Sequence, residues 1–278
     1  MKWNIVSDSS CDLTDIPERL PEVAYSSVPF TISVGRTDYV DDENLDVAEL
    51  IKAMENCPEA SHTSCPSPGA WYEQFSRAEQ SIAVTISSQL SGSYNSARAA
   101  KDIILEEQPE KKVYVLDSRS TGAELVLIVK KIHHLISCHV IFEDVVTLAQ
   151  DYADKTRVLF ALSSFENLVK NGRMSRISGF IAGKLGLWAI GLGSDEGKID
   201  MRHKTRGTGK MLALIIEEMQ HRGFSGDPVV ISHCQNSEAA ESLREKIKAI
   251  WKTAEVSIMP TRGLCSYYAE KGGLIIAF

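Results

Sequence analysis

Short apolar runs alternate with polar loops and helical segments along the first half of the chain. The apolar runs, each containing β-branched residues, lie at residues 3–6, 82–86 and 113–116. Each run leads into a loop rich in hydroxyl side chains, at residues 7–10, 87–93 and 117–122. A segment of helical character follows each loop, from residue 13, over 94–105 and over 123–135. Strands that alternate with helices in this way predict βαβ units and a parallel sheet.

The hydroxyl side chains of these loops predict an anion site. Ser, Thr and Asp are favoured helix N-caps, which would account for one or two of them in each loop. Each loop holds three or more Ser or Thr residues. Because such loops meet at the carboxyl edge of a parallel sheet, where α/β proteins bind ligands, we expect them to lie together. Hydroxyls and the first amides of a helix suit a carboxylate or a phosphate.

A fourth hydroxyl cluster lies at residues 62–69, and part of it has no obvious structural duty. Ser67 suits the N-cap of the next helix and Pro68 its first position, and Pro66 stiffens the loop before it. Thr63 and Ser64 remain without a capping role. We therefore expect these two side chains to face a ligand.

The second half of the chain has a different order of elements. We predict strands at residues 157–162, 187–192, 198–201, 229–231, 256–259 and 274–278, and helices at 177–185, 211–219 and 237–252. The turn residues Ser194-Asp195-Glu196-Gly197 predict a hairpin, and Asn171-Gly172-Arg173 predicts a turn. We therefore predict an α/β protein with a parallel-sheet N-terminal domain over residues 1–156 and an α+β C-terminal domain over 157–278.

Length and composition restrict the class of protein. The chain has 278 residues, with 30 Lys and Arg against 37 Asp and Glu, and a net charge of −7 at pH 7. This length fits two domains, and the charge argues against a nucleic-acid partner. The N-terminus lacks the apolar region of a secretory signal, and the longest nearly apolar stretch, 177–193, is short for a membrane span. We expect a cytoplasmic protein without stable membrane insertion.

Several kinds of chemistry find no support in the sequence. The six cysteines are scattered without a C-x-x-C pair, and we interpret His133, His134, Cys138 and His139 as a helix end before a strand at 140–142, rather than as a zinc site. We expect neither a metal nor a cofactor.

A phosphate-binding G-x-x-x-x-G-K-[ST] loop and a G-x-S-x-G motif are both absent. Many hydroxyls without a neighbouring base favour binding over catalysis. A hydrolase or phosphotransferase using a serine of residues 87–93, or a binder of another small acidic metabolite, remains an alternative.

Seven motifs, in chain order, resemble the DegV family of bacterial fatty-acid-binding proteins, which includes the binding subunits of fatty-acid kinase. The matching segments and the family patterns are Asp8-Ser9-Ser10-Cys11-Asp12-Leu13 (D-S-[ST]-x-D-L), Thr63-Ser64-Cys65-Pro66-Ser67-Pro68-Gly69 (T-S-Q-P-S-P-G), residues 86–97 (S-S-x-L-S-G-T-Y-x-S-A), Val115-Leu116-Asp117-Ser118 (V-x-D-S), Asn171-Gly172-Arg173-Met174-Ser175 (G-G-R-I-S), Glu196-Gly197-Lys198-Ile199 (D-G-K-[IL]) and Lys204-Thr205-Arg206-Gly207 (K-x-R-G). They span nearly the whole chain.

The resemblance implies a two-domain protein with a long-chain fatty acid buried between the domains. It implies that the carboxylate accepts hydrogen bonds from Thr63 and Ser91. The amides of Gly92 and Ser93, with Ser64, would add further donors. A single hydrogen bond to a charged group contributes about 1.5–3 kcal/mol, so a few such donors can fix the headgroup.

The resemblance also implies a partner and a division of labour. The family member does no chemistry itself and presents the fatty acid to a separate fatty-acid kinase, which phosphorylates the carboxylate. Arg173 and Arg206 match basic motifs expected to face the kinase or its nucleotide. The residues 177–192 are a candidate wall for the acyl chain.

Near its end the sequence departs from the family. The usual G-T-H-x-G-P-G segment is replaced by residues 263–273, which contain no histidine. The family histidine lies near the carboxylate, so another polar side chain is needed there. We expect Tyr268 or Ser266 to take this place, which indicates a divergent branch of the family.

Overall fold

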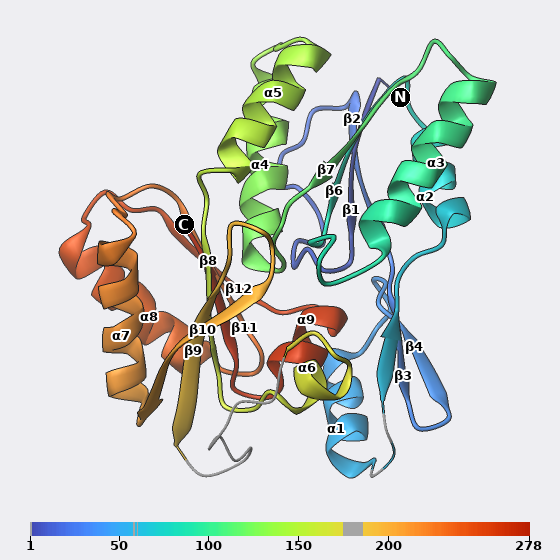
Figure 1. Cartoon of the computed structure of the whole chain (residues 1–278). Helices are drawn as coiled ribbons and strands as arrows, with labels where there is room; N and C mark the ends of the chain where they lie inside the picture. Colours follow the sequence, from blue (N-terminus) through green and yellow to red (C-terminus); the bar gives the residue numbers. More distant parts are fainter. Residues whose placement is uncertain (1, 58, 60, 175–185) are drawn as a thin grey trace.

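The computed structural model describes residues 2–57, 59, 61–174 and 186–278. A four-stranded parallel sheet, ordered β2-β1-β6-β7, forms the upper part of the molecule in Figure 1. Its strands are β1 (Trp3–Asp8), β2 (Val23–Val28), β6 (Gln80–Thr85) and β7 (Lys112–Asp117). This sheet confirms the parallel arrangement predicted from the three strand–loop–helix repeats.

Helices cover both faces of the parallel sheet. They are α2 (Pro68–Ser76), α3 (Ser93–Glu107), α4 (Ala123–Ser137) and α5 (Phe142–Ala153). Successive residues of a strand point to opposite faces. Val6 therefore packs with α2 and α3, whereas Ile5 packs with α4. Ser67 caps α2 as predicted, because its hydroxyl accepts a hydrogen bond from the Ala70 amide at 3.3 Å.

A second sheet of six strands, ordered β10-β9-β8-β13-β11-β12, is mixed. Its strands are β8 (Val158–Leu162), β9 (Leu187–Gly193), β10 (Ile199–Arg206), β11 (Val229–His233), β12 (Val256–Pro260) and β13 (Leu274–Ala277), and β9 and β10 form the predicted hairpin. Helices α7 (Thr208–His221) and α8 (Ser237–Ile250) pack on one face. Helix α4 lies between the two large sheets.

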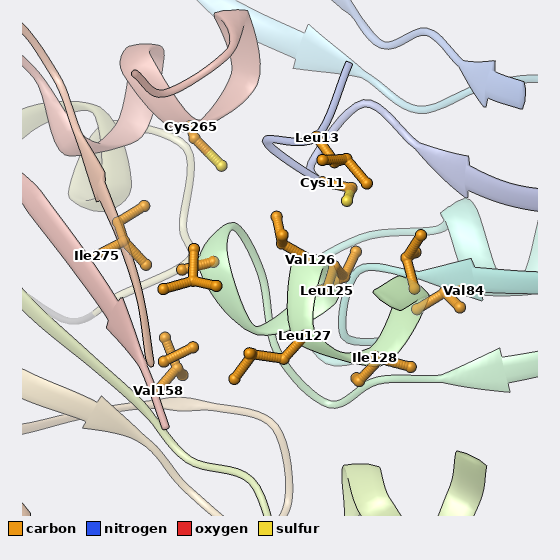
Figure 2. Close-up of a cluster of buried hydrophobic side chains, with 14 of the residues drawn as sticks. Cys11, Leu13, Val84, Leu125, Val126, Leu127, Ile128, Val158, Cys265 and Ile275 are labelled. Atoms are coloured by element: carbon orange, nitrogen blue, oxygen red, sulfur yellow. The ribbon is translucent and has the colours of Figure 1, made fainter. Parts of the chain in front are cut away.

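The first half of helix α4 is apolar on nearly all sides, with Glu124 as its one charged residue, because it contacts both sheets. Figure 2 shows its side chains between Val158 and Ile275 of the mixed sheet on one side and Leu13 and Val84 on the other. Every residue from 123 to 129 is buried. A helix that is hydrophobic all round is expected only where neighbours cover every face.

A small antiparallel sheet, ordered β4-β3-β5, lies beside helix α1 (Val47–Asn56). Its strands are β3 (Thr31–Val34), β4 (Thr37–Val40) and β5 (His62–Ser64). Two short helices, α6 (Glu166–Lys170) and α9 (Gly263–Ala269), lie near it in Figure 1, and α9 contacts both α1 and β3. This sheet carries Thr63 and Ser64, so it belongs to the candidate site.

Two predicted elements are wrong. Residues 9–22 form turns and bends instead of a helix, because Pro17 and Pro21 remove amide donors and restrict the residues before them. Residues 140–142 are not a strand, since α5 begins at Phe142 with Ile141 as its N-cap. The helix predicted at 177–185 lies outside the described residues. The division of the chain at residue 156 remains a prediction, although the change of sheet falls between α5 and β8.

Gly191 is required where the strand β8 lies against β9. A Cβ at this position would lie 2.4 Å from Phe160 Cζ and 2.6 Å from the carbonyl oxygen of Asp200. We expect Gly191→Ala to lower the free energy of unfolding by about 1–3 kcal/mol, because the packed ring and backbone must shift. Gly209→Ala is the control, since that position on α7 faces open space. It should raise stability by up to about 1 kcal/mol. Urea unfolding measures both, and equal stability of the two variants would contradict the packing argument.

Candidate ligand-binding site

A cavity of about 380 Å³ lies where the three sheets meet. This volume falls within the range of about 300–1,000 Å³ that is usual for small-molecule sites. Most of its lining is apolar. The apolar lining residues come from the loops of the parallel sheet, from β8, β10 and β13, and from α6 and α9: Phe30, Ile86, Leu90, Val158, Phe160, Leu162, Leu168, Ile199, Leu264, Ala269 and Ile275.

Polar side chains gather in one part of this lining. Thr63, Ser64, Ser91 and Tyr268 all line the cavity. The Thr63 and Tyr268 hydroxyls lie 2.8 Å apart, although the residues are 205 positions apart in the sequence. Burial raises the pKa of Tyr268, whereas the Thr63 hydroxyl and the Arg173 charge act in the opposite direction. The structure therefore brings together hydroxyls that the sequence could only propose separately.

Arg173 also lines the cavity rather than standing on an outer surface. Its Nε donates to the Leu90 carbonyl at 3.1 Å, and its Nη1 donates to the Asn171 carbonyl. Among the described residues it forms no ion pair with a carboxylate. A half-buried cation beside these hydroxyls is therefore without a counter-charge from the described protein. Arg206, by contrast, is exposed at the end of β10 and does not line the cavity.

Only part of the loop of residues 91–93 lies at the cavity. Ser91 and Gly92 line the cavity, whereas Ser93 does not. The Ser93 hydroxyl donates to Asp8 Oδ2 at 2.6 Å, and its amide donates to Ser91 Oγ at 3.2 Å. Ser93 therefore orients Ser91 and fixes the loop, and both of its donors are engaged inside the protein.

Asp8 explains why the first hydroxyl loop does not face the cavity. Its buried carboxylate accepts hydrogen bonds from the Ser10 hydroxyl at 2.5 Å and the Ile86 amide at 3.0 Å, in addition to Ser93. Burial raises the pKa of Asp8, and these hydrogen bonds oppose that effect. Ser9 is used in the same way, because its hydroxyl accepts from the Phe30 amide at 3.0 Å. The loop at residues 7–10 is thus hydrogen-bonded to the neighbouring loops and does not line the cavity.

The third hydroxyl loop contributes Ser120 and Thr121 to the lining, together with Arg119. Arg119 forms an ion pair with Asp154, and its guanidinium also donates to the Asp195 carbonyl at 3.3 Å. Sequence reasoning missed Arg119, although it lies inside a loop that had been singled out. Lys198, the other lining cation, lies 2.8 Å from Glu196. Both charges are therefore balanced within the protein, unlike that of Arg173.

The prediction that residues 177–192 form the wall of the acyl site is not supported where it can be checked. Residues 177–185 lie outside the described part, and none of residues 187–192 lines the cavity. Trp188, Ile190 and Leu192 point into the core beneath α7. The wall is formed by β8 and β13 instead, because their alternate side chains point away from α7.

Between the two candidates for the missing family histidine, Tyr268 is the one at the cavity. Ser266 is fully buried, and its hydroxyl lies 2.7 Å from that of Thr261. The lining residues that the structure describes include no His, Asp or Glu. A serine at this site therefore has no neighbouring general base in the described lining, which gives the hydrolase alternative no support.

Other features of the described chain add no further site. No group of three or more His, Cys, Asp or Glu is placed to hold a metal in the described residues. His134 and Cys138 are 3.9 Å apart, from Nε2 to Sγ, at the end of α4. Within the same residues, no helix is both long and apolar enough to cross a bilayer.

Several known proteins match this chain over nearly its whole length. The model of the DegV family, described as uncharacterised proteins, matches residues 2–278. A DegV domain-containing protein of Streptococcus pyogenes serotype M3 is 39% identical over 278 residues, which cover 100% of this chain and 99% of that relative. Among solved structures, the Streptococcus pneumoniae fatty acid kinase (Fak) B3 protein loaded with linoleic acid has a TM-score of 0.97 and 38% identity, covering 100% of this chain and 99% of that chain. A DegV family protein from Eubacterium eligens loaded with heptadecanoic acid has a TM-score of 0.95 and 34% identity, covering 99% of this chain and 98% of that chain.

Proposed function

Because the chain belongs to the DegV family, we propose that it binds a long-chain fatty acid in the cavity between its sheets. The observation that carries the proposal is the pairing of an apolar cavity with an unbalanced cation. Arg173 lines the cavity next to hydroxyl groups and has no carboxylate partner among the described residues. A fatty acid supplies both the apolar chain and the missing negative charge. The similar structures loaded with linoleic and heptadecanoic acids support this ligand class.

The headgroup site consists of hydroxyls and backbone amides. Thr63, Ser91 and Tyr268 provide hydroxyl donors, and Ser64 and Gly92 complete the proposed set. Each hydrogen bond to the carboxylate contributes about 1.5–3 kcal/mol. The acyl chain supplies most of the affinity, at about 0.8 kcal/mol for each buried CH₂ group. Ser93 acts one step away from the ligand, through Ser91.

A partner kinase would act on the carboxylate at the polar part of the cavity. Ser64 and Gly92 line the cavity and are also exposed, so this part of the site reaches the protein surface. The protein itself would hold and present the fatty acid without catalysis. Arg173, at the half-buried polar part of the cavity, would face both the carboxylate and the kinase or its nucleotide, and the exposed Arg206, outside the cavity lining, is proposed as a second contact with the kinase.

Organic extraction of the purified protein followed by mass spectrometry tests the proposed function. We expect a fatty acid of about C14–C18 in near-stoichiometric amount, because similar structures are loaded with linoleic and heptadecanoic acids and this chain has a cavity in the size range of small-molecule sites. Stripped protein should bind added oleate, which a fluorescence displacement assay measures. A lipid-free protein that also fails to bind oleate would refute the proposal. Recovery of a different acidic metabolite would favour the alternative binder.

A further inference from the structure

Helix α9 supplies four of the cavity-lining residues but is held by a distant part of the chain. Leu264, Cys265, Tyr268 and Ala269 all lie on it and line the cavity. The helix follows β12 of the mixed sheet, yet it packs against α1 and β3 of the small-sheet region. The N-cap residue of α9 is Arg262, and its side chain accepts no hydrogen bond from the first amides of the helix. The acceptors for these amides come from elsewhere.

Asp41 caps the start of α9 with both of its carboxylate oxygens. The Gly263 amide donates to Oδ1 at 2.9 Å and the Leu264 amide donates to Oδ2 at 2.8 Å. Asp41 is only 1% exposed and directly follows β4. A Cβ on Gly263 would lie 2.7 Å from Oδ1, so the absence of a side chain there lets the carboxylate approach the amides.

Arg262 and Asp12 complete the attachment at this end. The Arg262 guanidinium donates to the Asp41 carbonyl and to the Ser27 hydroxyl, both at 2.8 Å. Its amide donates to Asp12 Oδ1 at 2.9 Å. Three successive amides, at residues 262–264, are therefore bound by two buried carboxylates from the first 41 residues of the chain.

The other end of α9 is bound by the same small sheet. The Tyr267 hydroxyl lies 2.8 Å from that of Ser61, and the Tyr268 hydroxyl lies 2.8 Å from that of Thr63. Thr63 is on β5, which pairs with β3, and β3 pairs with β4 next to Asp41. One sheet thus fixes both the start of α9 and the tyrosine at its end.

We propose that Asp41 is a positioning residue for the fatty-acid headgroup site, because it fixes α9 and thereby holds the Tyr268 hydroxyl against Thr63. The inference rests on the proposed function and concerns a residue that does not touch the ligand. Asp41 sets the position of the first turn of α9, and Tyr268 lies little more than one helical turn further along. A shift of that first turn therefore displaces the Tyr268 hydroxyl from the carboxylate site.

The experiment compares Asp41→Asn with the wild type for two ligands, oleate and oleyl alcohol. Asparagine keeps one acceptor for the α9 amides but directs an NH₂ donor at the other. We expect the affinity for oleate to fall by about tenfold, the equivalent of one hydrogen bond to a charged group. The affinity for the alcohol should change less than about twofold, because the acyl cavity stays intact. Asp38→Asn is the matched control, since Asp38 is exposed on β4 and its carboxylate accepts a hydrogen bond from the Ser33 hydroxyl at 2.6 Å, away from α9. It should change neither affinity.

A double-mutant cycle with Tyr268→Phe separates positioning from general damage. Without the Tyr268 hydroxyl, Asp41→Asn should have little further effect on oleate binding. Gly263→Ala displaces the same turn without a change of charge and should reproduce the loss for oleate, which keeps the test available if Asp41→Asn does not fold. Unchanged oleate affinity in folded variants, equal losses for acid and alcohol, or additive effects with Tyr268→Phe would overturn the positioning role. Wild-type protein that binds neither ligand would instead refute the proposed function.

Discussion

Thr63→Val combined with Ser91→Ala is expected to weaken the binding of a C18 fatty acid by about 100-fold or more, since two hydrogen bonds to a charged group contribute about 1.5–3 kcal/mol each. Valine keeps the β-branched shape that suits β5, so the loss comes from the hydroxyl rather than from the fold. The change also removes the bond to Tyr268. Isothermal titration with the free acid, and with its methyl ester as a ligand that lacks the carboxylate charge, measures the effect.

The ester and a control pair of substitutions decide how the result is read. The affinity for the methyl ester should fall much less, because most of its binding comes from the acyl chain. Thr37→Val with Ser33→Ala makes the same chemical changes on β4 and β3, away from the cavity lining. We expect this control to bind the acid as the wild type does. A loss of less than about threefold in the double variant would show that these hydroxyls do not hold a charged headgroup.

The alternation of apolar runs and hydroxyl loops was enough to predict the parallel sheet and the edge at which its loops meet. The structure joins these loops directly, since the Ser87 amide donates to the Ser120 carbonyl at 2.8 Å. The pattern could not show which hydroxyls line the cavity and which form hydrogen bonds to other parts of the protein. Ser93 binds a buried acid 85 positions earlier in the chain, and such a partner leaves no local signal in either loop.

The small sheet was not predicted, because only β3 shows an alternation of buried and partly exposed residues, over four positions, and its two partner strands show none. Every residue of β4 is at least partly exposed, and β5 has only three residues. Thr63 was nevertheless identified, since Ser67 and Pro68 accounted for the helix start and left Thr63 without a role. Helix α9 has seven residues and owes its position to Asp41, more than 200 residues earlier. A contact of this range cannot be read from the helix's own sequence.

Asp12 is a buried acid whose ionisation makes the stability of the protein depend on pH. Its Oδ1 accepts from the Arg262 amide at 2.9 Å, whereas its buried Oδ2 has no hydrogen-bond partner in the described part of the chain. Burial raises its pKa from 3.8 to about 6. The folded state therefore binds this proton more tightly than the unfolded state does. The contribution of Asp12 to the free energy of unfolding is therefore greatest below about pH 4, and it is lost as the pH rises through about 6.

Asp12→Asn is expected to remove this dependence and to stabilise the protein at pH 7. Asparagine is neutral at every pH, keeps the acceptor for the Arg262 amide, and places an NH₂ group near the Ser232 hydroxyl, which also has no partner in the described part. The difference between about 6 and 3.8 in pKa corresponds to a gain of at most about 3 kcal/mol at pH 7. At pH 4 the variant and the wild type should be almost equally stable.

Urea unfolding at a series of pH values between 4 and 7 compares the two proteins. Burial also raises the pKa values of Asp8, Asp41 and Glu124, so the wild-type curve carries several contributions of the same sign. Only the difference between variant and wild type isolates Asp12. Asp15→Asn, at an exposed position in the same segment, should leave the curve unchanged apart from a small effect of its ion pair with Arg19. If the Asp12→Asn curve runs parallel to that of the wild type from pH 4 to pH 7, Asp12 is already ionised in the folded protein throughout this range, and the Oδ2 environment must stabilise its charge.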